Sequence, residues 1–239
     1  MLVANRAIAC GFLLLAPCVY GQDTPLERPA SDFNSKGVGL TETVLKFSHQ
    51  QHLRIAIQYV DRASMDRPIE VRLEDKTVRQ ALDSILQNGR GYRWQLRNGI
   101  VEITNSHASK RAEAQLNKVI PMFEISEGET VKLASAMLWW NLQIAVDPKL
   151  SGFAGHVMGE SSAVKPNKLH NRTVRDILSY IVVNSQAEAW IVSGPPECLG
   201  YTPYCGLWFL IEGEPYGSSY ESVHRKCAKI FKFVPSCPG

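Results

Sequence analysis

The side chains best suited to chemistry in this sequence are its histidines. His49 and His52 lie three residues apart on a predicted helix, so both can face the same way. They lack the glutamate and the four-residue spacing of a zinc-protease helix. His156, His170 and His224 fall in predicted loops or near the C-terminus. We therefore predict surface or interface histidines, with no catalytic residue, no metal site and no cofactor.

Four cysteines in the last part of the chain predict disulfides. Cys198, Cys205, Cys227 and Cys237 fit neither a zinc-ligand spacing nor a CxxC redox motif. Four cysteines in an oxidising compartment usually form two disulfides, with three possible pairings. Pairing by proximity joins Cys198 to Cys205 and Cys227 to Cys237, and each such loop is worth roughly 2 to 3 kcal/mol. The spacing leaves the connectivity open.

Aromatic residues gather in or beside the loop that a disulfide between Cys198 and Cys205 would close. They are Tyr201, Tyr204 and Trp208. A rigid loop with exposed aromatic rings suits contact with a partner protein or a glycan. A hairpin that is closed by the disulfide and has no binding role would also account for these aromatic residues. The three residues are therefore only candidate partner-binding positions.

The first 21 residues predict export. Arg6 supplies positive charge, the stretch from Ala7 to Ala16 is apolar, and small residues precede a cleavage point before Gln22. This run is too short to span a bilayer, so we do not expect an integral membrane protein. The alternative is a lipoprotein acylated at Cys18, although Pro17 fits that motif poorly. We expect a periplasmic or secreted protein, and association with the outer membrane is compatible with either alternative.

The net charge and the length of the chain exclude few classes of function. Arg6 is the one charged residue of the signal, so its removal lowers the formal charge from +3 to +2. The sequence has no clustered basic face of the kind that predicts nucleic-acid binding, so we expect no nucleic-acid partner. The chain of 239 residues can form one large or two small domains.

The elements that position these residues start with a small folding unit in the first half. Ile69 to Leu73 alternates apolar and charged residues, which predicts a strand. A helix follows, because Thr77 with Gln80 three residues later matches a capping box. An Asn-Gly pair at 98–99 predicts a tight hairpin within residues 92–103. The apolar face of the helix comprises Val78, Ala81, Leu82, Ile85 and Leu86.

The segments on either side complete a first domain at residues 37–104. Residues 37–60 predict a strand, a helix and a strand, with Leu40, Val44 and Phe47 on one helix face. Residues 22–36 are polar with two prolines and predict a linker. Residues 105–117 predict a connector or a helical spacer.

The same order then repeats in a second domain at residues 118–212. An extended segment at 119–125 precedes a helix from about Val131, a strand from Leu142 to Val146 and a short strand at 153–158. The triplet at 173–175 repeats Thr-Val-Arg at 77–79, an offset of 173 − 77 = 96 residues. Strands at 187–192 and 207–211 close the unit. The pattern predicts duplicated α+β units, two tandem small modules of β-α-β-β-α-β-β order with two helices each on short mixed sheets.

A set of residues in the first unit carries a family resemblance. They are Gly37, Val38, Gly39, Leu40, Val44, Leu45, Val71, Arg72, Leu73, Thr77, Val78, Ala81, Leu82, Leu86, Gly91 and Tyr92. With them the unit, about residues 37–104, resembles the short N-terminal domain of secretins and TonB-dependent signal-transducing receptors, also called the STN domain. The second unit is a degenerate copy, similar to a secretin N-domain, with Ile177-Leu178 in place of Ala-Leu.

This resemblance implies periplasmic α+β modules that bind other envelope proteins and carry no catalytic residues. Only a cysteine-containing tail, residues 213–239, follows the second unit, so we expect the module without the channel. The expected function is that of an exported adaptor that docks onto a secretin or a TonB-dependent system. A glycan- or peptidoglycan-binding periplasmic protein is the alternative.

Overall fold

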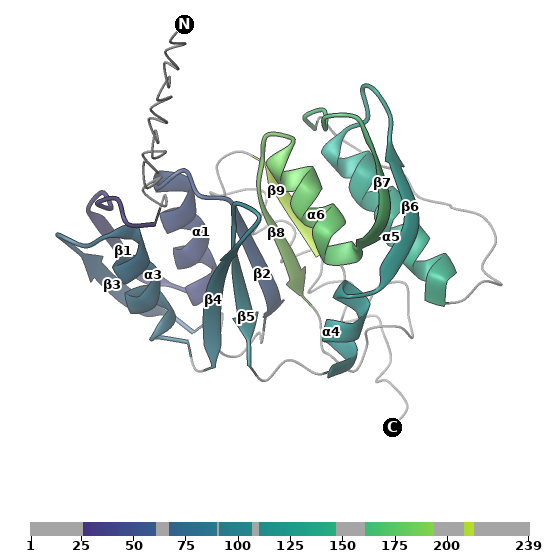
Figure 1. The fold of residues 1–239 in the computed structure, drawn as a ribbon. Coiled ribbons are helices and arrows are strands. Elements are labelled where there is room, and N and C mark those ends of the chain that lie inside the picture. The colour runs from purple at the N-terminus through teal and green to yellow at the C-terminus, as the bar shows by residue number, and fades with distance from the viewer. Residues whose placement is uncertain are drawn as a thin grey trace, which may run out of the picture.

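The computed structural model describes residues 26–60, 67–89, 91–106, 110–146, 161–193 and 208–212. The predicted signal peptide at 1–21 and the tail at 213–239 lie outside these residues. The described part has the α+β character that the sequence predicts (Figure 1). Its first half consists of β1 (Phe33–Val38), α1 (Leu40–Gln50), β2 (Ile55–Val60), β3 (Ile69–Leu73), α3 (Val78–Leu86), β4 (Tyr92–Arg97) and β5 (Ile100–Asn105).

The second half follows a similar order. It consists of α4 (Lys110–Leu116), β6 (Val119–Ile125), α5 (Val131–Val146), β7 (Asn167–Thr173), α6 (Val174–Val183), β8 (Ala187–Ser193) and β9 (Trp208–Glu212). The helix α4 occupies the segment predicted as a connector or spacer. The short strand predicted at 153–158, which would lie between α5 and β7, falls outside the described residues.

The two helices that follow the repeated triplet begin in the same way. Thr77 and Thr173 both have extended backbone, with φ/ψ of −73°/160° and −71°/156°. Each threonine oxygen accepts a hydrogen bond from the backbone N–H three residues later, on Gln80 and Asp176. The five apolar positions predicted for α3 are buried, and so are the equivalent positions of α6, Val174, Ile177, Leu178, Ile181 and Val182. Local sequence therefore sets both helix starts.

Strands from both halves combine in one five-stranded sheet of order β4-β5-β2-β8-β9 (Figure 1). The strand β2 lies at its centre and pairs in parallel with β5 on one side and β8 on the other. Two smaller antiparallel ladders, β1–β3 and β6–β7, accompany it. The two predicted units thus share a sheet across their junction.

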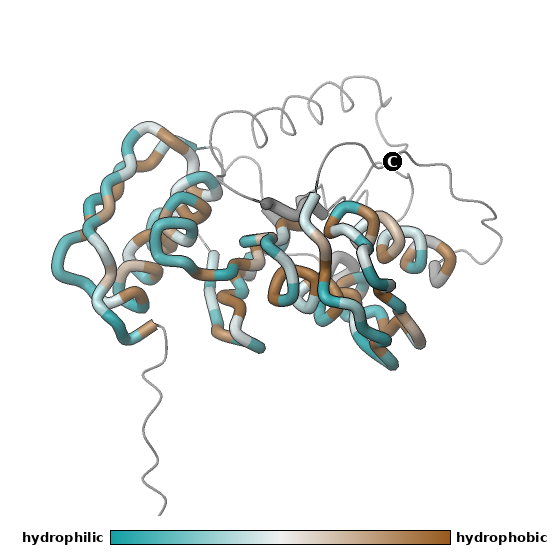
Figure 2. The backbone as a smooth tube through the Cα atoms, turned by 90° about the horizontal axis from the view of Figure 1, so that it is seen from above, coloured by the Kyte–Doolittle hydropathy of each residue, from teal (hydrophilic) through white to brown (hydrophobic). Residues whose placement is uncertain are grey.

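This sheet separates two hydrophobic cores. Ile55, Ile57 and Ile191 belong to the core beneath α1 and α3, whereas Ala56 and Trp190 belong to the core beneath α5 and α6. Figure 1 shows the two helix pairs on opposite sides of the sheet. Hydrophobic and hydrophilic positions alternate along many of the outer elements in Figure 2, as expected where one face of an element is buried. Because both faces of β2 are covered, its sequence is almost continuously apolar.

Two predictions of element type are wrong. Leu142 to Val146 was predicted as a strand, but α5 continues to Val146. A short apolar run fits either a helix or a strand, and here no Gly or Pro interrupts the preceding helix. Residues 26–36 were predicted as part of a linker, yet Phe33 begins β1 and Leu26 is only 1% exposed.

No helix among the described residues is both long enough and apolar enough to cross a membrane.

Candidate functional site

Most of the residues singled out in the sequence lie outside the described part of the structure. This is the case for Cys198, Cys205, Cys227, Cys237, Tyr201 and Tyr204. Trp208 opens β9, where only the backbone is described. The predicted disulfides and the aromatic loop therefore stay predictions.

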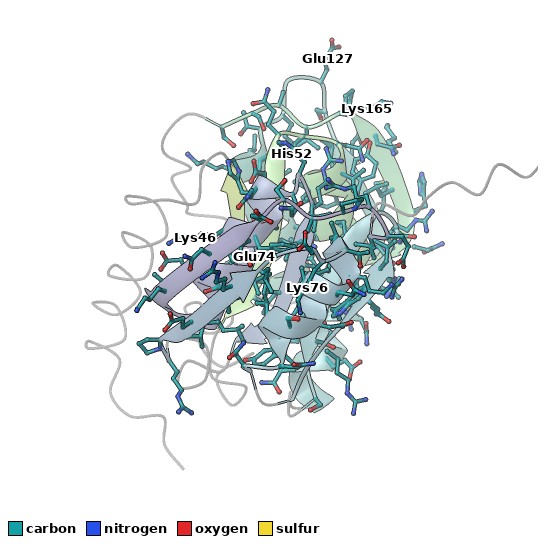
Figure 3. The ribbon with its side chains drawn as sticks, turned by 90° about the vertical axis from the view of Figure 1, so that its left-hand side faces the viewer. Lys46, His52, Glu74, Lys76, Glu127 and Lys165 are labelled. Carbon is teal, nitrogen blue, oxygen red and sulfur yellow. The ribbon has the colours of Figure 1, made fainter. Side chains whose placement is uncertain are left out.

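His156 and His224 lie outside the described residues, and the described histidines of the sequence prediction lie on separate elements. His49 lies in the last turn of α1, and its Nδ1 is 2.8 Å from Oε2 of Glu188 on β8. The helix α1 ends at Gln50, so His52 lies in the turn that follows it. His52 has a φ of 51°, and its side chain is exposed (Figure 3). His170 is exposed on β7. Within the described ranges, no group of three or more His, Cys, Asp or Glu side chains could hold a metal ion.

A local irregularity of β8 places Glu188 opposite His49. Ala187 and Ala189 pair with consecutive residues of β9, so Glu188 is the extra residue of a β-bulge. Bulges of this kind redirect a side chain. The hydrogen bonds join α1 to β8 across 139 positions of sequence. His49 is a candidate from its sequence position, whereas its partner Glu188 is not, because a bulge has no reliable sequence signal.

The open edge of the central sheet is a more distinctive feature. Among the described strands, β4 pairs only with β5 and stands first in the strand order. The pairing is antiparallel and continuous over all six residues, from Tyr92 opposite Asn105 to Arg97 opposite Ile100. Asn98 and Gly99, at φ of 52° and 78°, form the predicted two-residue turn.

This register determines which peptide groups of β4 face outward. The residues that flank a two-residue hairpin turn exchange hydrogen bonds, and such pairs alternate with non-bonded pairs. Arg97, Gln95 and Arg93 therefore bond to β5, whereas the N–H and C=O groups of Trp94 and Leu96 point away from it. In the part of the chain that the structure describes, these outward groups have no hydrogen-bond partner.

Side chains hold the β4–β5 hairpin from both faces. On one face, Nε1 of Trp94 donates to Asp83 Oδ1 at 2.7 Å, and the Arg79 guanidinium lies 5.2 Å from the Trp94 ring centroid. On the other face, Nη1 of Arg175 on α6 lies 3.7 Å from Oε2 of Glu102 on β5. Arg79 and Arg175 are the third residues of the two Thr-Val-Arg triplets. The repeated arginine thus contacts the same hairpin twice, once from each half of the chain.

The Glu102 face of the hairpin is a buried polar network. The Glu102 and Arg175 side chains are 1% and 6% exposed. Gln95 Nε2 donates to Glu102 Oε2 at 3.0 Å, and Arg175 Nη2 donates to Asn117 Oδ1 at 3.3 Å. The neighbouring Arg97 and Asp176 form an ion pair at 3.1 Å. These contacts fix the hairpin to α6.

Two of the other described edge strands are interrupted. The strand β1 has a register shift at Gly37, whose φ is 74°. The strand β6 contains Pro121, which has no N–H to donate. Bulges and prolines of this kind protect natural edge strands from pairing with other chains. Neither is present in β4, and Leu96 on this strand is 39% exposed.

The sequence located this edge only in part. It predicted the turn at 98–99 and both strands of the hairpin. That no described strand pairs with the outer side of β4 depends on the order of strands in the sheet, which no local pattern encodes.

Comparison with known proteins adds no relative: no family model, no curated protein and no solved structure matches this chain.

Proposed function

We propose that this protein is a non-catalytic interaction module that binds a partner protein through the open edge of β4. The outward peptide groups of Trp94 and Leu96 carry this proposal. An extended segment of a partner can add to such an edge, where main-chain hydrogen bonds supply affinity and alternate side chains supply specificity. At about 20 Å, β4 is long enough for a partner strand of ordinary length.

The rigidity of the hairpin supports this function. Contacts from α3 on one face and from α6 on the other hold β4 in the conformation that an added strand requires. Such preorganisation lowers the conformational entropy lost on binding. The predicted export signal and the resemblance of residues 37–104 to secretin and TonB-receptor domains favour a bacterial envelope assembly as the partner. In that setting the protein acts as an exported adaptor.

Site-specific crosslinking tests the proposal. A photoreactive phenylalanine analogue replaces Leu96 or, as a control, Met122, which is 56% exposed on β6. We expect one partner from the envelope to be crosslinked at position 96 and not at position 122. The partner is then identified by mass spectrometry and purified for binding measurements.

Binding of the purified partner is compared between two variants at the same position. Leu96→Pro removes an outward N–H without removing a hydrogen bond to β5, and Leu96→Thr retains that N–H. We expect the proline variant to bind roughly tenfold or more weakly than the threonine variant. Equal binding by both variants, with unchanged circular dichroism spectra, would refute docking at this edge.

A further inference from the structure

We infer that the partner strand carries acidic residues on one face and apolar residues on the other. This inference rests on the proposed docking at β4 and specifies the chemistry of the partner. Successive side chains of β4 point to opposite faces of the sheet. The faces differ strongly in charge, so a strand added at this edge meets two different environments.

The face toward α6 presents positive charge. Arg93, Gln95 and Arg97 are all exposed on it. Arg97 has an ion pair with Asp176 but is still 43% exposed, and the same Asp176 accepts the Thr173 hydroxyl. Arg93 has no ion pair among the described residues. Two guanidinium groups therefore lie four residues apart along the edge. The acidic groups on this face, Asp176 and Glu102, already contact Arg97 and Arg175.

On the face toward α3, β4 itself presents apolar and aromatic side chains, and Arg79 and Asp83 of α3 contact Trp94. Leu96 is 39% exposed, and Trp94 is half-buried beside it. Cross-strand neighbours on one face of a sheet interact directly, and aromatic or β-branched pairs stabilise it. A partner strand with Val or Ile on this face would cover Leu96 and the exposed part of Trp94.

A second copy of this chain does not fit the edge as well. In the antiparallel register centred on Gln95, Arg93 of each copy lies opposite Arg97 of the other. Like charges directly opposite one another destabilise a sheet. A heterologous strand of the pattern acidic–apolar–any–apolar–acidic instead places a carboxylate opposite each arginine. In that register the charges of β4 disfavour a second copy and favour an acidic partner.

Synthetic peptides test this preference. The probe is an acetylated and amidated peptide of sequence Thr-Glu-Val-Thr-Val-Glu-Thr, and the control peptide has Lys in place of Glu. Binding to the full mature chain is followed by the fluorescence anisotropy of a dye on the peptide. At low salt we expect the acidic peptide to bind roughly tenfold or more tightly than the basic one.

Variants of the protein test whether Arg93 and the outward N–H of Leu96 cause this peptide preference. Arg93→Glu should weaken binding of the acidic peptide and strengthen binding of the basic peptide, whereas Arg93→Lys should retain the original preference. Leu96→Pro should weaken both peptides, because the outward N–H is lost. Arg93 has no described ion pair within the fold, so its substitution should leave the melting temperature nearly unchanged.

The outcomes separate this inference from the proposed function. Equal binding of both peptides, abolished by Leu96→Pro, would overturn the acidic preference and leave edge docking intact. Binding of the acidic peptide that Leu96→Pro does not affect would place the peptide elsewhere and overturn the inference. Absence of binding by either peptide also overturns it, while crosslinking at position 96 tests edge docking independently.

Discussion

His49 and Glu188 are 139 positions apart in sequence, yet His49 Nδ1 lies 2.8 Å and 3.0 Å from the two carboxylate oxygens of Glu188. The pair connects the end of α1 to the bulge of β8. Both side chains are 32% exposed, so solvent screens their attraction. The contact therefore lies where the two halves of the chain meet, but it contributes little to their stability.

We predict that His49→Ala and Glu188→Gln each lower the free energy of unfolding by no more than about 1 kcal/mol. Urea denaturation of both single variants and the double variant measures this loss and the coupling between the residues. A hydrolytic activity of the protein that is lost in His49→Ala would contradict the non-catalytic proposal.

Hydrogen exchange should reveal the edge of β4 directly. We predict that the backbone amides of Trp94 and Leu96 exchange much faster than those of Arg93, Gln95 and Arg97, because only the latter bond to β5. Residue-resolved exchange measured by NMR provides the test. Uniform protection along β4 would mean that the outward groups are covered in solution.

The buried pair of Glu102 and Arg175 should be costly to break. Glu102→Ala leaves the Arg175 guanidinium buried without its carboxylate, and we predict a loss of about 3 to 5 kcal/mol of unfolding free energy. Combining it with Arg175→Leu should recover part of that loss, because the unpaired charge is removed. Chemical denaturation of the two variants measures both effects. A loss below about 1 kcal/mol for Glu102→Ala would show that water replaces the carboxylate as the partner of the Arg175 guanidinium.

The two threonine caps should contribute similar amounts of stability. We predict that Thr77→Ala and Thr173→Ala each cost about 1 kcal/mol, because each removes the acceptor for an N–H in the first helical turn. Serine at either position keeps the acceptor and serves as the matched control. The caps lie on helices in different cores, so the two losses should add in the double variant when measured by urea denaturation.

Gly89 should not tolerate a side chain. A Cβ there would lie 2.3 Å from Leu40 Cδ2 and 2.8 Å from Tyr92 Cδ2, and both neighbours are buried. We predict that Gly89→Ala lowers the free energy of unfolding by about 1 to 3 kcal/mol. Leu40→Val removes the nearest atom, so the double variant should lose less than the sum of the single losses in thermal or urea unfolding. Strict additivity would argue against the clash.

Local sequence determined the elements of this protein that depend on near neighbours. The capping threonines, the apolar faces of α3 and α6 and the turn at Asn98 and Gly99 each involve residues within a few positions of one another. Such patterns set backbone conformation through short-range hydrogen bonds and the burial of one face. They were therefore predictable without knowledge of the fold.

Only the tertiary structure decided how these elements combine. The parallel pairing of β2 with both β5 and β8 joins segments far apart through backbone hydrogen bonds, which carry no side-chain code. It also decided that Leu142 to Val146 is helical, because the same apolar residues can be buried by a helix or by a strand. The open edge of β4 and the contact of Arg175 with Glu102 follow from that strand order. Spacing along the chain can predict which residues form a strand, but the neighbours of that strand depend on the packing of the whole molecule.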